Sequence, residues 1–355
     1  MKKVSLLFSV LIIFVLLFGT IFSCTGKTEP AKPSEPTSPS TPQKAIPIRL
    51  VIPSPAGDDL TTKDEKIAER FNKRAGGKYE LKVYPGNSLA QVPEYLDAVR
   101  TGAVEMADIG WPIFAGIDPK LGLMELPFLF DTVEGFASIT GGLTEMYDPL
   151  FQEKLNQKAL GAFTTGGMEL IGNKQIKTLA DWKGKLVGAI SPPLAVLAEK
   201  LGAGSQIIMW TDLYSALEKG VVDDGIMGLH GVIQLGITDV IDYVTKFYGT
   251  SGMNGYTINL DVWNKMPKDI QDALTEEIAT TCKEQNELFI QYDTEDIKVL
   301  QDKGIEVYIL PKAERDKWVP LVMPYTDEQL AAAGDFGAKI KQLAAEANKK
   351  YPYKD

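Results

Sequence analysis

The sequence is poor in the residues from which most catalytic and metal sites are built. It contains one histidine, His230, and two cysteines, Cys24 and Cys282. A single histidine cannot form a multi-histidine metal site, and a serine or cysteine triad would have only that base. There is also no G-x-S-x-G elbow and no H-E-x-x-H motif. We therefore expect no metal, no cofactor and no catalytic residue, and little supports a secreted hydrolase.

Basic side chains are also in deficit. The chain carries 37 Lys and Arg against 47 Asp and Glu, a net charge of −10 at pH 7, and its basic residues form no cluster in the sequence. Nucleic acid is therefore not expected as a partner.

Lipidation of Cys24 would leave Cys282 without a disulfide partner. Cys282 lies in a long helical pattern, which favours a packed thiol over a nucleophile.

The N-terminus has the layout of an export signal. Two lysines precede an uncharged apolar run from Val4 to Phe22, and Ser23 and Cys24 follow it. The run approaches transmembrane length, so an uncleaved anchor is the alternative. A small residue before a cysteine resembles a bacterial lipoprotein box, which favours a signal peptide over residues 1–23 and lipidation at Cys24. Both the lipoprotein signal and the uncleaved anchor put the rest of the chain outside the cytoplasm. The lipoprotein signal also implies a lipid anchor in the membrane.

Residues 24–46 are rich in Pro, Ser and Thr and have few large apolar side chains. Such a segment cannot bury enough surface to fold, so we expect a disordered tether.

Beyond the tether, strands and helices alternate in two similar series. The first has strands at IRLVIP, YELKVYP and VEMADIG, and the second at KLVGAIS, SQIIMW and VVDDGIM, with a helical pattern between successive strands. This alternation predicts an α/β fold with parallel sheets and right-handed crossovers. A further helical period from Pro267 to Gly304 would span roughly 55 Å, enough to run along two lobes.

Ligands of such sheets bind beyond the carboxyl ends of the strands. Two sets of strand ends that face one another would form a cleft. The candidates at these ends are Ser54, Asn87, Trp111, Ser191, Met209, Trp210, Ile226 and Met227. Strand-end Met and Trp residues are also common in cores, so we expect about half of such a set to contact ligand.

Five segments, in this order, carry a family resemblance. They are ELKVYPGNSLAQVPEYLDAVRTGAVEMADIG, LMELPFLFD, IKTLADWKGKLVGAI, DLYSALEKGVVD, and DYVTKFYG with VWNKMPKDIQDAL. The chain resembles the DctP-type solute-binding proteins of tripartite ATP-independent periplasmic (TRAP) transporters from about Ile48 to Tyr351. The resemblance implies capture of a solute outside the membrane and its delivery to a membrane permease driven by an ion gradient.

The resemblance also implies a two-lobed, periplasmic-binding-protein-like (type II-like) α/β fold with a lobe-crossing helix and a central cleft. We expect lobe I to comprise residues 47–165 and 253–293, and lobe II residues 166–252 and 294–350. Glycines gather in residues 164–167 and 249–255, which are either hinges for lobe closure or ordinary loops.

This chain departs from the family where ligand is usually held. Most members carry an arginine that pairs with a substrate carboxylate, and that position falls on Gly188. A second basic position falls on Gly167 or Met168, and polar positions fall near Ile226 and Met227. These departures indicate a cleft lined by Trp111, Met209, Trp210, Ile226 and Met227, suited to an apolar or aromatic solute.

Polar contacts remain available to a ligand. The candidates are Ser54, Asn87, Ser191, Asn254 and Tyr256, while His230 is expected at a loop or helix start and is a weaker, uncharged candidate. Backbone N–H groups after Ser191 or Trp210 could also hold a carboxylate. We therefore expect a receptor for a small, largely apolar or aromatic solute. An organic-acid receptor without the arginine and a ligand-sensing surface lipoprotein are the alternatives.

Overall fold

The structure, a computed structural model, describes residues 44–354. The expected signal peptide, Cys24 and all but the last residues of the expected tether lie outside this range. Within residues 44–354, no helix combines the length and the apolar composition needed to cross a membrane.

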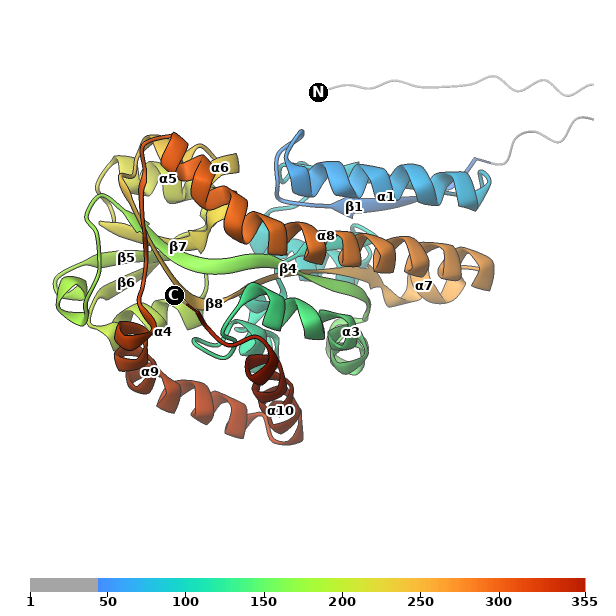
Figure 1. Cartoon of the computed structure of the whole chain (residues 1–355). Helices are drawn as coiled ribbons and strands as arrows, with labels where there is room; N and C mark the ends of the chain where they lie inside the picture. The colour runs from blue at the N-terminus through green and yellow to red at the C-terminus, as the bar shows by residue number, and fades with distance from the viewer. Residues whose placement is uncertain (1–43, 355) are drawn as a thin grey trace, which may run out of the picture. The chain divides into compact units, whose positions relative to one another are not determined.

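Strands of the described residues form one nine-stranded sheet in the order β2-β1-β3-β8-β4-β7-β5-β6, with β9 paired to β8 (Figure 1). The strands are β1 (Ile46–Val51), β2 (Tyr79–Tyr84), β3 (Met106–Ile109), β4 (Gln157–Gly172), β5 (Leu186–Ala189), β6 (Gly204–Ile207), β7 (Asp224–Gly228), β8 (Tyr243–Asn259) and β9 (Glu306–Ile309).

The helices cover both faces of this sheet. They are α1 (Asp59–Ala75), α2 (Tyr95–Thr101), α3 (Val133–Leu155), α4 (Pro192–Leu201), α5 (Trp210–Glu218), α6 (Leu229–Gln234), α7 (Leu260–Lys265), α8 (Lys268–Asp302), α9 (Lys312–Ala332) and α10 (Asp335–Lys350). Short 3₁₀ helices are η1 (Val92–Glu94), η2 (Trp111–Phe114), η3 (Pro119–Glu125), η4 (Leu179–Trp182) and η5 (Ile237–Asp239).

The two predicted βαβαβ series are both present. Strands β1 to β3 are mutually parallel and form lobe I, while β5 to β7 are mutually parallel and form lobe II. The lobes share one sheet instead of holding two separate ones. The reason is that β4 and β8, of 16 and 17 residues, pair antiparallel along both lobes.

The lobe-crossing helix is α8. At 1.5 Å per residue its 35 residues extend about 52 Å, and Figure 1 shows it running past both lobes. Ile270, Leu274 and Ile278 near its start pack in the core of lobe I, and Leu300 near its end packs in a core of lobe II. The predicted two-lobed α/β fold with a crossing helix is confirmed.

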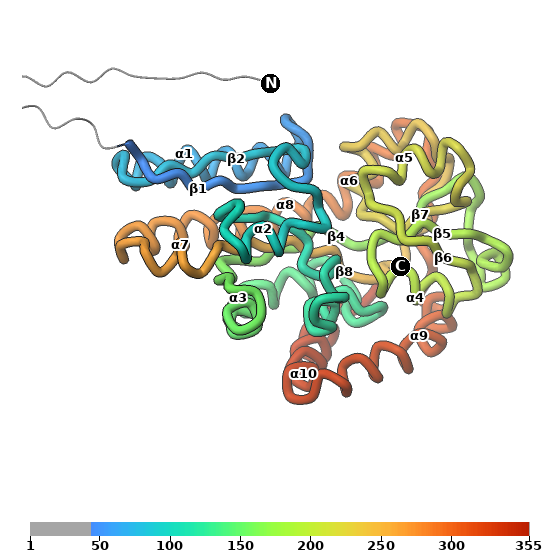
Figure 2. The backbone as a smooth tube through the Cα atoms, turned by 180° about the vertical axis from the view of Figure 1, so that it is seen from behind, coloured from blue at the N-terminus to red at the C-terminus, as the bar shows by residue number. Residues whose placement is uncertain are grey.

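The C-terminal helices also join the lobes. Helix α9 packs against α4 of lobe II and α10 packs against α3 of lobe I (Figure 2). The sheet register shifts between Thr164 and Gly167, where Gly166 has a φ of 92° that favours glycine. This bulge coincides with the predicted hinge at residues 164–167. That the hinge moves stays a prediction, and so do the exact lobe boundaries.

Candidate functional site

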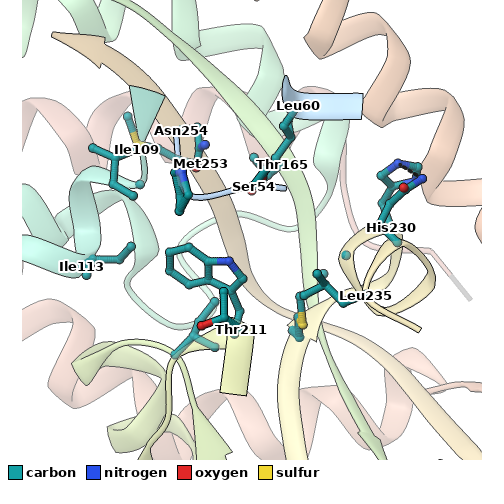
Figure 3. Close-up of a pocket in the computed structure, with 18 of the residues that line it drawn as sticks. Ser54, Leu60, Ile109, Ile113, Thr165, Thr211, His230, Leu235, Met253 and Asn254 are labelled. Atoms are coloured by element: carbon teal, nitrogen blue, oxygen red, sulfur yellow. Dashed lines mark hydrogen bonds between the residues drawn. The ribbon is translucent and has the colours of Figure 1, made fainter. Parts of the chain in front are cut away.

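A cavity lies between the two lobes and is lined by both. It encloses about 960 Å³ of space free of protein atoms, its open mouth included, and Figure 3 shows the side chains around it. Most of the lining is apolar, including Ile109, Ile113, Met168, Ile190, Trp210, Met227, Leu235, Met253 and Phe289. The polar lining side chains are Ser54, Asp58, Glu125, Thr165, Thr211, His230, Gln234 and Asn254.

The lining follows the carboxyl ends of the parallel strands, as predicted. Ser54 follows β1, Gly110 follows β3, and Ile190 follows β5. The end of β2 does not contribute, because β2 is the edge strand farthest from lobe II.

Part of the predicted ligand-binding set lines the cavity: Ser54, Met168, Trp210, Met227 and Asn254. They come from both lobes and meet at one space. That they contact a ligand stays a prediction. Asn87, Trp111, Gly188, Ser191, Met209, Ile226 and Tyr256 are outside the lining.

Trp111 is a core residue. It is fully buried, with ring centroids 5.4 Å from Tyr147 and 4.8 Å from Phe151. A Cβ added at Gly255 would lie 2.4 Å from the Trp111 ring, so the glycine makes room for the indole. The residues on either side of Trp111, Gly110 and Pro112, line the cavity in its place.

Gly188 does not stand at the cavity. A Cβ added there would lie 2.9 Å from Leu213 of α5 and 3.4 Å from Val222, so this face of β5 packs against α5. The space that an arginine side chain would enter is therefore filled by core. Ile226 on β7 is likewise fully buried, whereas Met227 beside it faces the cavity.

Three further candidates outside the lining, Tyr256, Asn87 and Met209, have structural partners. Tyr256 is fully buried and donates a hydrogen bond to Asp64 Oδ1 at 2.7 Å. Asn87 adopts a left-handed φ of 58° and accepts a hydrogen bond from the Tyr95 hydroxyl at 3.0 Å. Met209 is the residue before α5 and packs on the lobe I core.

The cavity lining within residues 44–354 lacks the lysine or arginine that usually binds a carboxylate. Among the described residues that line the cavity there is no Lys and no Arg, and the titratable ones are Asp58, Glu125 and His230. Asp58 caps α1 and accepts a hydrogen bond from the Leu60 N–H at 2.8 Å. Burial raises the pKa of the Asp58 carboxyl. A carboxylate ligand would thus meet acidic side chains and no basic partner other than the His230 imidazole, whose two nitrogens already face Asp59 and Asp296.

Glu125 ends η3 and is the most deeply buried of these titratable residues, at 5 % exposure. Burial raises the pKa of its carboxyl to about 7, and the hydroxyl of Ser191 counteracts part of this shift. Glu125 belongs to the segment LMELPFLFD, which carries part of the family resemblance, but no role was expected for this residue. It lies at no strand end, so the strand-end rule could not find it.

His230 occupies the start of α6, as expected, and its ring is engaged on all sides. Its Nε2 lies 3.2 Å from Asp59 Oδ2 and its Nδ1 3.4 Å from Asp296 Oδ1. The ring stacks on Tyr292 at 3.9 Å. Burial alone would lower the pKa of His230, but Asp296 and Asp59 outweigh it and raise the pKa. His230 therefore bridges Asp59 and Asp296 while lining the cavity, and its contact with a ligand stays a prediction.

Asn254 connects the cavity to a buried charge cluster. Its amide donates to Asp108 Oδ1 at 3.1 Å. Asp108 and Asp64 both accept hydrogen bonds from Lys63, which is 4 % exposed. The hydrogen bond to Asp108 therefore fixes the orientation of the Asn254 amide.

Comparison with known proteins decides the family. Residues 54–332 match the family "Bacterial extracellular solute-binding protein, family 7", named DctP. The chain belongs to this family. Its members are transport solute-binding proteins and not enzymes, so this chain is an extracytoplasmic solute-binding protein.

Individual relatives are distant. The chain is 26% identical to the C4-dicarboxylate-binding periplasmic protein DctP of Rhodobacter capsulatus over 80% of this chain and 86% of the relative. It is 25% identical to the C4-dicarboxylate-binding protein DctB of Bacillus subtilis over 73% and 75%. A marine metagenome TRAP solute-binding protein specific for pyroglutamate shares the fold with a TM-score of 0.80 at 20% identity, covering 86% of this chain and 100% of that one.

Proposed function

We propose that this family-7 receptor captures a small, largely apolar or aromatic solute that is not a carboxylate. One observation carries the proposal: Lys and Arg are absent from the described residues that line the cavity. A carboxylate needs charge-assisted donors to offset its desolvation, and a bidentate arginine is the usual solution. Here the corresponding strand position, Gly188, packs against α5.

The remaining lining fits an apolar body. Met168, Met227 and Met253 are flexible and polarisable, and Trp210 offers a broad aromatic face. Thr211, Gln234 and Asn254 add a few uncharged polar groups that orient a ligand without demanding charge.

An organic acid is the second candidate, because two of the relatives above are named for C4-dicarboxylates and one for pyroglutamate. The backbone N–H groups at the start of α4 give it little support. Its first two residues, Pro192 and Pro193, have no N–H to donate. The start of α5 at Trp210 and Thr211 keeps its N–H groups and is the better place for such an acid.

We further propose that the receptor is tethered to the membrane through lipidated Cys24 and delivers its solute to TRAP permease subunits. Closure of the two lobes over the cavity would present the loaded form to the permease. Ligand drives such closure only through its higher affinity for the closed state.

Thermal-shift measurements on the purified protein test the solute class. We expect 2-phenylethanol, 2-phenylethylamine or indole to raise the melting temperature, and succinate, malate and pyroglutamate to leave it unchanged. A ligand at a hundred times its Kd adds about 2.7 kcal/mol to the free energy of unfolding, which is easily measured. Stabilisation by the carboxylates alone would overturn the proposal and favour the organic-acid receptor.

A further inference from the structure

We propose that Glu125, which lines the cavity and is supported by Ser191 outside the lining, forms a polar subsite that binds the N–H donor group of the solute, an ammonium or amine. This inference rests on the proposed apolar cavity and names the chemistry of its polar end. The solute would then have an apolar or aromatic body and a basic head.

The first support is that both side chains are buried and unsatisfied. Glu125 is 5 % and Ser191 1 % exposed, and neither Glu125 Oε2 nor Ser191 Oγ has a hydrogen-bond partner among the described residues. Buried polar groups in native proteins nearly always have partners. A buried carboxyl that lines the cavity and has an oxygen without a protein partner would be satisfied by an N–H donor of a ligand.

The second support is the local sequence after Ser191. A serine before a helix normally accepts a hydrogen bond from the second or third backbone N–H of that helix. Pro193, at the second position, has no N–H, and Ser191 makes no capping bond. The helix therefore does not use this hydroxyl, which lies near enough to Glu125 to lower the pKa that burial of the carboxyl has raised.

The third support is the sign of the charges around the cavity. Of the other titratable lining residues, Asp58 is acidic, and His230 lies between Asp59 and Asp296. No Lys or Arg from the described residues joins the lining. A positive ligand group is favoured in such a field and a negative one is disfavoured.

Ligand polarity can be varied at constant shape to test this subsite. Calorimetry at pH 8, where most of the Glu125 carboxyl is ionised, would measure binding of 2-phenylethylamine, 2-phenylethanol and phenylacetate. We expect the amine to bind most tightly and the acid most weakly. The variant Glu125→Gln keeps the shape but removes the charge, and we expect it to weaken amine binding about tenfold or more. It should change binding of the alcohol far less.

Two further variants separate a ligand-binding role from a structural one. Glu145→Gln changes an exposed glutamate on α3 and should leave all three affinities unchanged. Glu125→Met removes a buried unsatisfied carboxyl, so we expect it to raise the melting temperature of the ligand-free protein while abolishing amine binding.

The outcomes distinguish the two proposals. Equal binding of amine and alcohol, unaffected by Glu125→Gln, would overturn the subsite and leave the apolar receptor standing. Tightest binding of phenylacetate would overturn both. Failure of the amine to bind at millimolar concentration, or a lower melting temperature for Glu125→Met, would also overturn the subsite.

Discussion

His230 Nε2 lies 3.2 Å from Asp59 Oδ2, and this contact joins α6 of lobe II to the first residue of α1 in lobe I. Asp59 also accepts a hydrogen bond from the Tyr292 hydroxyl at 3.0 Å. The imidazole on its other side faces Asp296 of α8. Three segments distant in sequence therefore meet at one histidine beside the cavity.

We expect this bridge to stabilise the protein most at low pH within the range where histidine titrates. The pKa of His230 is raised in the folded state, so its stabilising contribution is full below the unfolded pKa of about 6.5 and is lost as pH rises through the folded pKa. His230→Gln should therefore lower the melting temperature more at pH 6 than at pH 9. Circular dichroism melts of both proteins at each pH check this.

Subtracting the melting temperature of His230→Gln from that of the wild-type protein at each pH cancels the effect of other titrating groups, which the two proteins share. Tyr292→Phe is a useful companion, since it removes a hydrogen bond to Asp59 from a hydroxyl whose raised pKa keeps it protonated at both pH values, so it should destabilise equally at pH 6 and pH 9. An equal loss for His230→Gln at pH 6 and pH 9 would show that the charge of the imidazole contributes nothing.

Much of the fold could be predicted because its signals are local. Alternating strands and helices indicated both parallel halves, and the helical period from Pro267 to Gly304 indicated α8 nearly to its ends. The continuity of the sheet could not be predicted. It depends on β4 and β8 pairing across the bulge near Gly166, and the two strands are far apart in the sequence.

The candidate site was predicted in part for a similar reason. The strand-end rule selects a region of a few residues, but the pleat sends neighbouring side chains to opposite faces. Met227 faces the cavity and Ile226 the core, and no sequence pattern distinguishes them. Glu125 lies on a 3₁₀ helix, and only long-range packing brings it beside Ser191.

Substitutions at Gly188 test where this face of β5 points. We expect Gly188→Ala to lower the free energy of unfolding by about 1–3 kcal/mol, because the new Cβ would meet Leu213 at 2.9 Å. Gly188→Arg should prevent stable folding. Gly141→Ala, on the exposed face of α3 with no atom within 4 Å, should instead stabilise by roughly 0.5–1 kcal/mol. Urea unfolding measures all three.

A well-folded Gly188→Arg protein that has lost only ligand binding would place this position at the cavity. That result would restore the interpretation in which Gly188 faces the ligand.

Gly255→Ala tests the packing of Trp111. The added Cβ would lie 2.4 Å from a rigid indole that is already held by Tyr147 and Phe151. We expect a loss of about 1–3 kcal/mol or more in the free energy of unfolding. A loss smaller than that of Gly188→Ala, measured by the same urea titration, would mean that the indole yields more easily than its two aromatic neighbours suggest.

The buried ammonium of Lys63 should be needed mainly above neutral pH. It lies between the carboxylates of Asp64 and Asp108, and burial raises the pKa of Asp64 to about 7 even with Lys63 present. Lys63→Met leaves two uncompensated carboxyls, and we expect a loss of about 3–5 kcal/mol at pH 8.

The loss should shrink at pH 5. A carboxyl whose folded pKa is raised favours the folded state when protonated, and that contribution declines as pH rises from about 4 through 7. At pH 5 the Asp64 carboxyl of the variant would hold its proton and could donate a hydrogen bond to Asp108 in place of the ammonium. Lys73→Met, which breaks an exposed pair with Glu69 on the same helix, should change stability by under about 0.5 kcal/mol at either pH. Guanidinium unfolding of both variants at pH 5 and pH 8 provides the comparison. A loss for Lys63→Met that is the same at the two pH values would show that the lysine contributes through packing and not through its charge.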